Sequence, residues 1–92
     1  MSMNSSQYYD QIIDLHGKTV DDALQELDAL ICRSPAKRIK IIHGHGTGRL
    51  KKAVRDFVSS HELVSQIQLG EDLMTSGSSG TLIIEVYFFP YT

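Results

Sequence analysis

Two short apolar runs on either side of one amphipathic segment constrain the fold of this 92-residue chain more than any other feature. Residues 11–15 (QIIDL) and 38–43 (RIKIIH) have the length and the aliphatic character of strands. Between them, apolar residues recur at helical spacing from Val20 to Ile31, just after Thr19, which forms a near capping box with Asp22. A strand, a helix and a strand in this order predict two parallel strands joined by a right-handed crossover.

The second half of the chain continues this alternation. The glycine-rich turn 44–48 leads into an amphipathic segment that ends near Ser60. Residues 64–69 alternate as a half-buried strand does, residues 70–80 form a Gly- and Ser-rich loop, and residues 81–89 are the most strand-like run. We therefore expect an α/β two-layer sandwich of order β-α-β-α-β-β, with two helices on one face of a four-stranded mixed sheet.

Length and composition restrict the class of protein. A chain of 92 residues makes one domain, expected over residues 11–92 after an N-terminal extension of residues 1–10. The single cysteine, Cys32, excludes an internal disulfide and a four-cysteine zinc site. The sequence has no apolar run long enough to span a membrane, and its first ten residues lack the pattern of a secretory signal. We expect a cytoplasmic protein without membrane contact, and a monomer because its apolar positions all fit one core.

Charge is segregated along the chain, although the net charge is only −2. Eight of the nine basic residues lie between Arg33 and Arg55, a stretch without Asp or Glu. Such segregation predicts a local anion-binding face. A charge run alone is more often a solvated helix or strand face than a binding face, so this pattern needs a second feature beside it.

Three titratable side chains are expected at one edge of the sheet. Asp14 and His16 stand two residues apart at the end of the first strand, so they share a face, and His43 ends the second strand. The carboxyl ends of neighbouring parallel strands meet at one edge, where ligands bind in open α/β sheets. Asp14, His16 and His43 are therefore candidate catalytic residues, whereas each histidine taken singly would more often be structural.

The turn Gly44-His45-Gly46-Thr47-Gly48 is the second feature that points to an anion. It opens into a helix N-terminus, where unpaired N–H groups and the helix dipole favour phosphate. It does not match the Walker or dinucleotide patterns, and a tight structural turn is the alternative interpretation. The candidate phosphate- and nucleic-acid-binding residues are Gly44, His45, Gly46, Thr47, Gly48, Arg49, Lys51, Lys52 and Lys40.

Other candidate sites are less specific. The side chains of Asp14, His16, His43 and His45 would suit zinc or manganese, but they lack the helical H-E-x-x-H spacing. A divalent metal ion, Mg²⁺ or Mn²⁺, is the candidate cofactor. His61 follows the second helix and is predicted to be a helix-end charge or a surface residue without a companion. Cys32 is predicted to be a small, half-buried hydrophobic residue.

Three segments together resemble the Smr (small MutS-related) domain family. They are Ile13-Asp14-Leu15-His16-Gly17, residues 43–48 (HGHGTG) and residues 77–86 (GSSGTLIIEV). Members of this family are associated with endonuclease activity that nicks DNA or cuts RNA, including mRNA on stalled ribosomes. The resemblance implies Asp14, His16 and His43 at an active centre, and the glycine turn as a phosphate holder. In this chain His45 stands where many members have lysine, and other members have arginine in place of His16.

From these features we expect a nucleic-acid endonuclease that cleaves a phosphodiester bond of RNA or nicks DNA. A module that binds nucleic acid or the ribosome without cutting is the main alternative, and a domain that binds a small metabolic anion is a third. The sequence does not distinguish RNA from DNA, and it leaves the cofactor open, with a divalent metal ion as a candidate.

Overall fold

The chain alternates strands and helices in the order that its sequence predicts. The structure, a computed structural model, describes residues 9–33, 38–70 and 80–87. Its elements are β1 (Gln11–Asp14), α1 (Val20–Arg33), β2 (Arg38–Ile42), α2 (Arg49–Ser60), β3 (Val64–Leu69) and β4 (Thr81–Val86). The predicted order β-α-β-α-β-β is confirmed.

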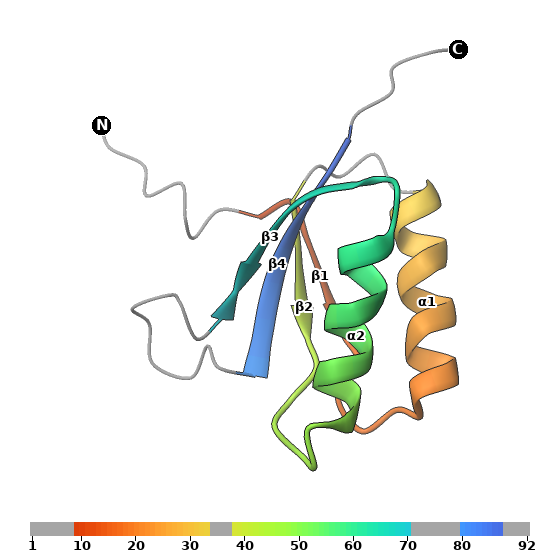
Figure 1. Cartoon of the computed structure of the whole chain (residues 1–92), viewed down its shortest axis with the longest axis vertical. Coiled ribbons are helices and arrows are strands. Elements are labelled where there is room, and N and C mark those ends of the chain that lie inside the picture. Colours follow the sequence, from red (N-terminus) through yellow and green to blue (C-terminus); the bar gives the residue numbers. More distant parts are fainter. Residues whose placement is uncertain (1–8, 34–37, 71–79, 88–92) are drawn as a thin grey trace.

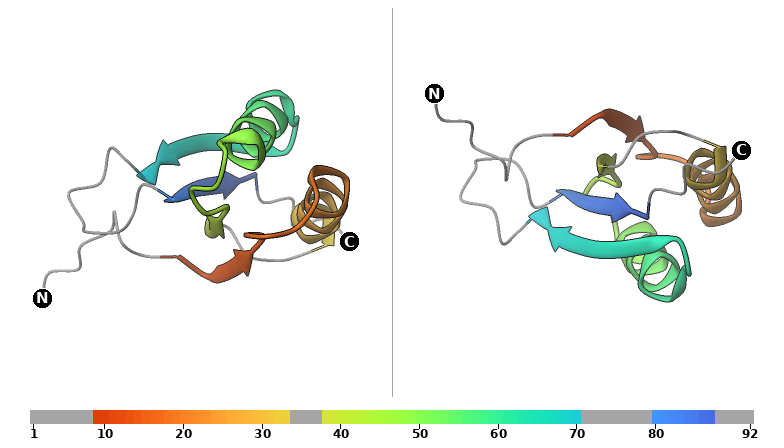
Figure 2. Two further views of the ribbon diagram at one scale, coloured as in Figure 1. Left: turned by 90° about the horizontal axis from the view of Figure 1, so that it is seen from below. Right: turned by 90° about the horizontal axis from the view of Figure 1, so that it is seen from above.

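The strands form one mixed sheet of order β1-β2-β4-β3. β1 pairs with β2 in parallel, and β4 lies antiparallel to both β2 and β3. Both helices lie on the same side of this sheet and run side by side (Figure 1), as the views along the helices also show (Figure 2). The predicted two-layer arrangement and the parallel crossover pair are therefore confirmed.

A single core lies between the sheet and the helices. Because side chains alternate along a strand, Ile39 and Ile41 of β2 face the helices, whereas Lys40 between them faces the other way. The buried core residues are Leu15, Ala23, Leu27, Ile31, Ile39, Ile41, Val54, Val58, Leu82, Ile84 and Val86. Leu15 is completely buried, so the residues on either side of it, Asp14 and His16, project away from the core.

The element boundaries differ little from those that the sequence predicts. Thr19 caps α1, because its Oγ1 accepts the N–H of Asp22 at 3.2 Å. β4 ends at Val86, earlier than the predicted residue 89; residues 88 and 89, like most of the predicted loop 70–80, lie outside the described residues. Among the described residues no helix is long and apolar enough to cross a membrane.

Candidate functional site

The carboxyl ends of β1 and β2 lie side by side, as the parallel pairing requires. Asp14 is in register with Ile42, and the N–H of Leu15 donates to the carbonyl of Ile42 at 2.7 Å. The residues that follow, His16 from β1 and His43 from β2, therefore reach the same edge of the sheet. Both line one cleft of about 620 Å³, which we call the edge cleft; its walls are residues 16–21 and 43–50.

Asp14 holds His16 through two hydrogen bonds. Oδ1 of Asp14 accepts the His16 side chain at Nδ1 (2.6 Å) and the His16 backbone N–H (3.1 Å). These bonds, the side-chain one first, lower the pKa of Asp14 below its usual value, so its carboxyl is ionised at neutral pH. A carboxylate can only accept, so Nδ1 bears the proton and Nε2 of the neutral ring carries the lone pair. Both side chains are largely exposed, the imidazole at 67%.

His43 is the buried counterpart of His16. Only 4% of its surface is exposed, and its backbone N–H donates to the carbonyl of Gly80 at 3.0 Å. Its Nδ1 lies 2.8 Å from the carbonyl oxygen of Gly44, so Nδ1 is the donor. The ring is therefore fixed in orientation. Since His43 lines the edge cleft, that ring belongs to the same site as His16.

The glycine turn requires glycine for two separate reasons. Gly44, Gly46 and Gly48 have φ values of 77°, 39° and 87°, a region that side chains other than glycine rarely adopt. At Gly44 a Cβ atom would also lie 3.1 Å from Cβ of His16, so only glycine allows the turn to approach that histidine so closely. The turn thus places backbone directly against the Asp14–His16 pair.

The turn ends where α2 begins. Gly48 is the N-cap residue, and the carbonyl of Gly48 accepts the N–H of Lys52 at 3.0 Å. N–H groups in the first turn of a helix have no partner within the helix, and the helix dipole adds positive potential there. Arg49 and Leu50 from that first turn line the edge cleft. The arrangement would suit an anion beside two imidazoles.

The other predicted basic residues lie outside the walls of the edge cleft. Lys51 and Lys52 follow on α2, and Lys52 forms an exposed ion pair with Asp56 at 3.1 Å. Lys40 is further away, because it occupies the face of β2 that is turned from the helices, with its Nζ 5.3 Å from the centre of the Tyr9 ring. The structure therefore does not bring Lys40 to the catalytic candidates.

Three polar wall residues were missed by the sequence interpretation. Lys18, Thr19 and Asp21 line the edge cleft from the start of α1. Lys18 also forms an ion pair with Glu26 at 3.0 Å. The sequence could have predicted their position, because the helix after the first strand begins at the carboxyl end of that strand. Its N-terminus must therefore lie at the same edge of the sheet as Asp14 and His16.

Gly80 is a further residue that sequence reasoning left out of the site. Its carbonyl accepts both the N–H of His43 (3.0 Å) and the N–H of Gly44 (2.9 Å). A Cβ atom on Gly80 would lie 3.3 Å from Cα of Gly44, so this position is closely packed. Gly80 belongs to the third segment of the family resemblance, which is the signal that could have included it.

The residues of the edge cleft do not form a metal site by themselves. Within the described part of the chain, the ligand atoms of Asp14, His16, His43 and His45 do not gather in a group of three. A cluster of three donor atoms lies elsewhere, at Asp28, Cys32 and His61. His61, predicted to have no companion, is thus paired with Asp28, because α1 and α2 pack side by side. Cys32 is exposed instead of half-buried, because Ile31 takes the core position.

Comparison with known proteins identifies the family. The Smr domain model matches residues 13–87. Endonuclease MutS2 of Caldicellulosiruptor saccharolyticus is 38% identical over 80 residues, and MutS2 of Geobacillus sp. is 38% identical over 79. These matches cover 84% and 80% of this chain, but the chain spans only about 10% of each of those proteins.

Two solved structures share the fold. The crystal structure of the Smr domain of Thermus thermophilus MutS2 superposes with a TM-score of 0.76 at 25% identity, over 85% of this chain and 99% of that domain. The solution structure of the SMR domain of NEDD4-binding protein 2 gives 0.59 at 23% identity, over 88% and 90%, and shows the likeness of fold alone. On the family match and these relatives, the chain belongs to the Smr domain family.

Proposed function

We propose that this domain is a nucleic-acid endonuclease whose catalytic residues are Asp14, His16 and His43. One observation supports this above the others. An oriented, exposed imidazole and a buried one line the same cleft, next to a helix N-terminus that suits a phosphate. Two imidazoles beside an anion site are the groups that phosphodiester cleavage needs, since one must take a proton and the other must give one.

The relatives support the same class of reaction. The MutS2 proteins that the chain matches are named endonucleases, and the matched part is the Smr domain. The matched part is only about 10% of each relative, so the name of the whole protein does not by itself assign the activity to this domain. We propose the activity because the residues of the edge cleft also support it.

On RNA, His16 and His43 can supply both proton transfers of the cleavage reaction, and the substrate supplies the nucleophile. Nε2 of His16 takes the proton of the 2′-hydroxyl, whose oxygen attacks phosphorus, and the bond from phosphorus to the 5′-oxygen breaks. His43, in its protonated form, gives its Nε2 proton to that departing oxygen. The products are a 2′,3′-cyclic phosphate and a 5′-hydroxyl. Asp14 keeps Nδ1 of His16 protonated and stabilises the imidazolium that forms.

The charge that develops on the phosphate falls at the start of α2. The backbone of the first turn of the helix is fixed there before the reaction, although the N–H of Arg49 donates to Oγ1 of Thr47 at 3.3 Å, and prearranged N–H donors stabilise a transition state strongly. The exposed guanidinium of Arg49 would add a positive charge beside them. Lys51 and Lys52 follow Leu50 on α2, where they would attract the phosphates on either side of the cleaved one.

DNA lacks the 2′-hydroxyl, so nicking needs an activated water molecule. A divalent ion such as Mg²⁺ or Mn²⁺ is the usual means. Since the described residues of the edge cleft do not assemble three ligands, such an ion would rely on phosphate oxygens of the substrate. We therefore propose RNA as the better substrate.

The test is incubation of the full chain with labelled single-stranded RNA and with supercoiled plasmid, each with and without chelator, followed by identification of the product ends. We expect RNA cleavage that survives the chelator and leaves cyclic phosphate ends. Gln25→Ala, on the exposed side of α1, serves as the control variant and should behave as the wild type. Products with 3′-hydroxyl and 5′-phosphate ends would show instead that activated water is the nucleophile.

A second candidate function is binding of nucleic acid, or of the RNA surface of a ribosome, without cleavage. The observation that favours it is that basic residues continue along α2 beyond the edge cleft. Both functions predict binding that weakens with salt, so salt dependence does not separate them. Wild-type protein that binds RNA but never cleaves any substrate would support the binding module.

A further inference from the structure

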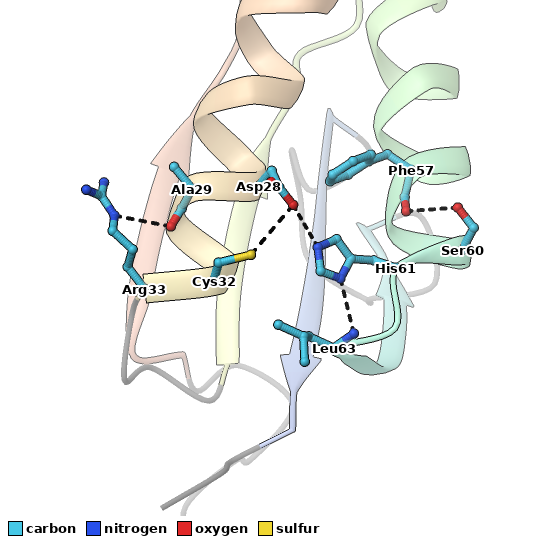
Figure 3. Close-up of polar contacts among 8 residues, drawn as sticks. All are labelled: Asp28, Ala29, Cys32, Arg33, Phe57, Ser60, His61 and Leu63. Atoms are coloured by element: carbon cyan, nitrogen blue, oxygen red, sulfur yellow. Dashed lines mark hydrogen bonds and ion pairs between the residues drawn. The ribbon is translucent and has the colours of Figure 1, made fainter. Parts of the chain in front are cut away.

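A second group of polar side chains lies at the other end of the helix pair from the edge cleft. Both helices begin at the cleft, so their C-terminal ends lie about 20 Å away, the length of the 14-residue helix α1. Figure 3 shows Asp28 and Cys32 of α1 facing His61, the residue that follows α2. Oδ1 of Asp28, Sγ of Cys32 and Nε2 of His61 all lie within 4.8 Å of one another.

Two elements of the fold bring these donors together. Asp28 and Cys32 are four residues apart on α1 and therefore share one face, with Sγ 3.8 Å from Oδ1 of the carboxylate. The imidazole of His61 reaches across from the end of α2, with Nε2 2.9 Å from the same oxygen. Two donors thus come from α1 and the third from the residue that follows α2, so the packing of the two helices brings the three backbone positions together before any ligand arrives.

The histidine is the rigid member of the cluster. Its side chain is only 11% exposed, and it packs edge-on against Phe57 with ring centres 5.3 Å apart. Its Nδ1 accepts the N–H of Leu63 at 3.1 Å. Asp28 and Cys32 are exposed, and a cavity of about 560 Å³ opens on all three residues. A small ion can therefore enter from solvent and meet one fixed ligand and two adjustable ones.

The kinds of donor atom point to one kind of ion. Thiolate, imidazole and carboxylate are each zinc ligands, whereas Mg²⁺ and Ca²⁺ take oxygen ligands. We propose that Asp28, Cys32 and His61 form a zinc-binding site that leaves a fourth coordination position open to the cavity. Nothing in the proposed cleavage reaction uses this site, which lies at the far end of the helices.

Zinc binding would change the protonation, and therefore the hydrogen bonds, of Cys32 and His61. It replaces the proton of the Cys32 thiol, and it replaces the proton that Nε2 of His61 donates to Asp28. The proton of the neutral ring then moves to Nδ1, which faces the N–H of Leu63, so the hydrogen bond from Leu63 is lost. That loss makes the site weaker than a four-ligand structural zinc site, and it marks the Leu63 amide as a reporter of binding.

The experiment is a titration of the untagged full chain with Co²⁺, a coloured substitute for Zn²⁺, followed by displacement with Zn²⁺. We expect saturation at one equivalent with a thiolate-to-cobalt absorption band. Cys32→Ser should abolish the band and weaken zinc binding at least about tenfold, as Asp28→Asn should weaken it. Asp22→Asn, an exposed carboxylate elsewhere on α1, is the matched control and should bind as the wild type.

Three outcomes overturn the proposal. The first is a wild-type chain without saturable cobalt binding, and the second is a Cys32→Ser variant that binds zinc as tightly as the wild type. The third is a Leu63 amide whose NMR signal stays in place when zinc saturates the protein, because His61 would then not be a ligand. Cys32 is exposed, so its serine variant should fold, and its RNA cleavage should equal that of the wild type. Failure of zinc binding is thereby distinguished from failure of the proposed nuclease.

Discussion

Among the residues that the structure describes, Asp14–His16 and Asp28–His61 are two aspartate–histidine pairs that use opposite ring nitrogens. In the pair Asp14–His16 the carboxylate binds Nδ1, and Nε2 of an exposed ring carries the lone pair at the edge cleft. In the pair Asp28–His61 the carboxylate binds Nε2, and Nδ1 accepts a backbone N–H (Figure 3). The first ring keeps a nitrogen for proton transfer, whereas the second has both nitrogens engaged within the protein.

Burial separates the pairs further. His61 is nearly buried and joins the end of α2 to α1, so its hydrogen bonds contribute to stability. His16 is exposed, and Asp14 holds it beside the glycine turn, so under the proposed function its orientation serves proton transfer. The same two residue types thus serve different purposes, decided by which nitrogen the carboxylate takes and by what surrounds the ring.

The largest expected difference between the pairs is in catalysis. Asp14→Ala should lower RNA cleavage by roughly 10- to 1000-fold, because His16 loses the partner that fixes its proton and its orientation. Asp28→Ala should leave the cleavage rate of folded protein unchanged. The measurement is the single-turnover rate of RNA cleavage by each variant with saturating protein. Equal losses of cleavage rate in Asp14→Ala and Asp28→Ala would contradict a catalytic role for the first pair alone.

The second difference is in stability. His61→Ala should lower the free energy of unfolding by about 1 to 3 kcal/mol, because the Asp28 carboxylate and the Leu63 N–H lose their partner and Phe57 loses a packed ring. For a domain of this size that corresponds to a fall in Tm of roughly 4 °C or more. Urea unfolding measures it, with Glu62→Ala as an exposed neighbouring control. An unchanged midpoint would contradict a structural role for this pair.

A third prediction tests the close approach of the glycine turn to His16, a contact that His61 of the second pair does not have. Gly44→Ala should destabilise the domain more than Gly46→Ala, by about 1 kcal/mol. Both substitutions force a side chain into positive φ, but only at Gly44 would the new Cβ meet His16, whereas no atom lies within 4 Å at Gly46. Thermal unfolding and cleavage should both rank the variants in that order. The reverse order would show that the turn does not support His16.

The smallest expected effect is the pH dependence of the first pair. Because the pKa of Asp14 is lowered in the folded state, its contribution to stability is full above the usual aspartate pKa and is lost as pH falls through the lowered value. The wild type should therefore lose slightly more stability than Asp14→Asn only at pH below about 4. NMR titration of the Asp14 carboxyl checks this directly. A midpoint at or above the usual aspartate value would contradict the hydrogen bond to His16.

The first pair and its cleft could be predicted from sequence because their determinants are local. Asp14 and His16 are two residues apart, and the strand–helix–strand order alone places His43 beside them. Lys40 lies between Ile39 and Ile41, which face the core, so the alternation of side chains along a strand puts it on the opposite face of β2. The same sequence pattern therefore also predicts that Lys40 lies away from the edge cleft.

The second pair could not be predicted in the same way. Asp28 and His61 are 33 residues apart and meet only because α1 and α2 pack side by side with particular faces turned toward each other. Helix periodicity predicts which residues face the core, but it does not give the rotation of one helix against its neighbour. The exposure of Cys32 depends on the same rotation, since Ile31 takes the adjacent core position.

The central claim is that His16 transfers a proton and does no more than that. The most direct measurement compares His16→Ala with the wild type on one labelled RNA, recording affinity, Tm and the single-turnover cleavage rate of the same preparations. The account predicts unchanged affinity and Tm with a cleavage rate reduced by about 100- to 10,000-fold. A variant that cleaves at the wild-type rate, or one whose lost cleavage is matched by lost RNA binding, would contradict it.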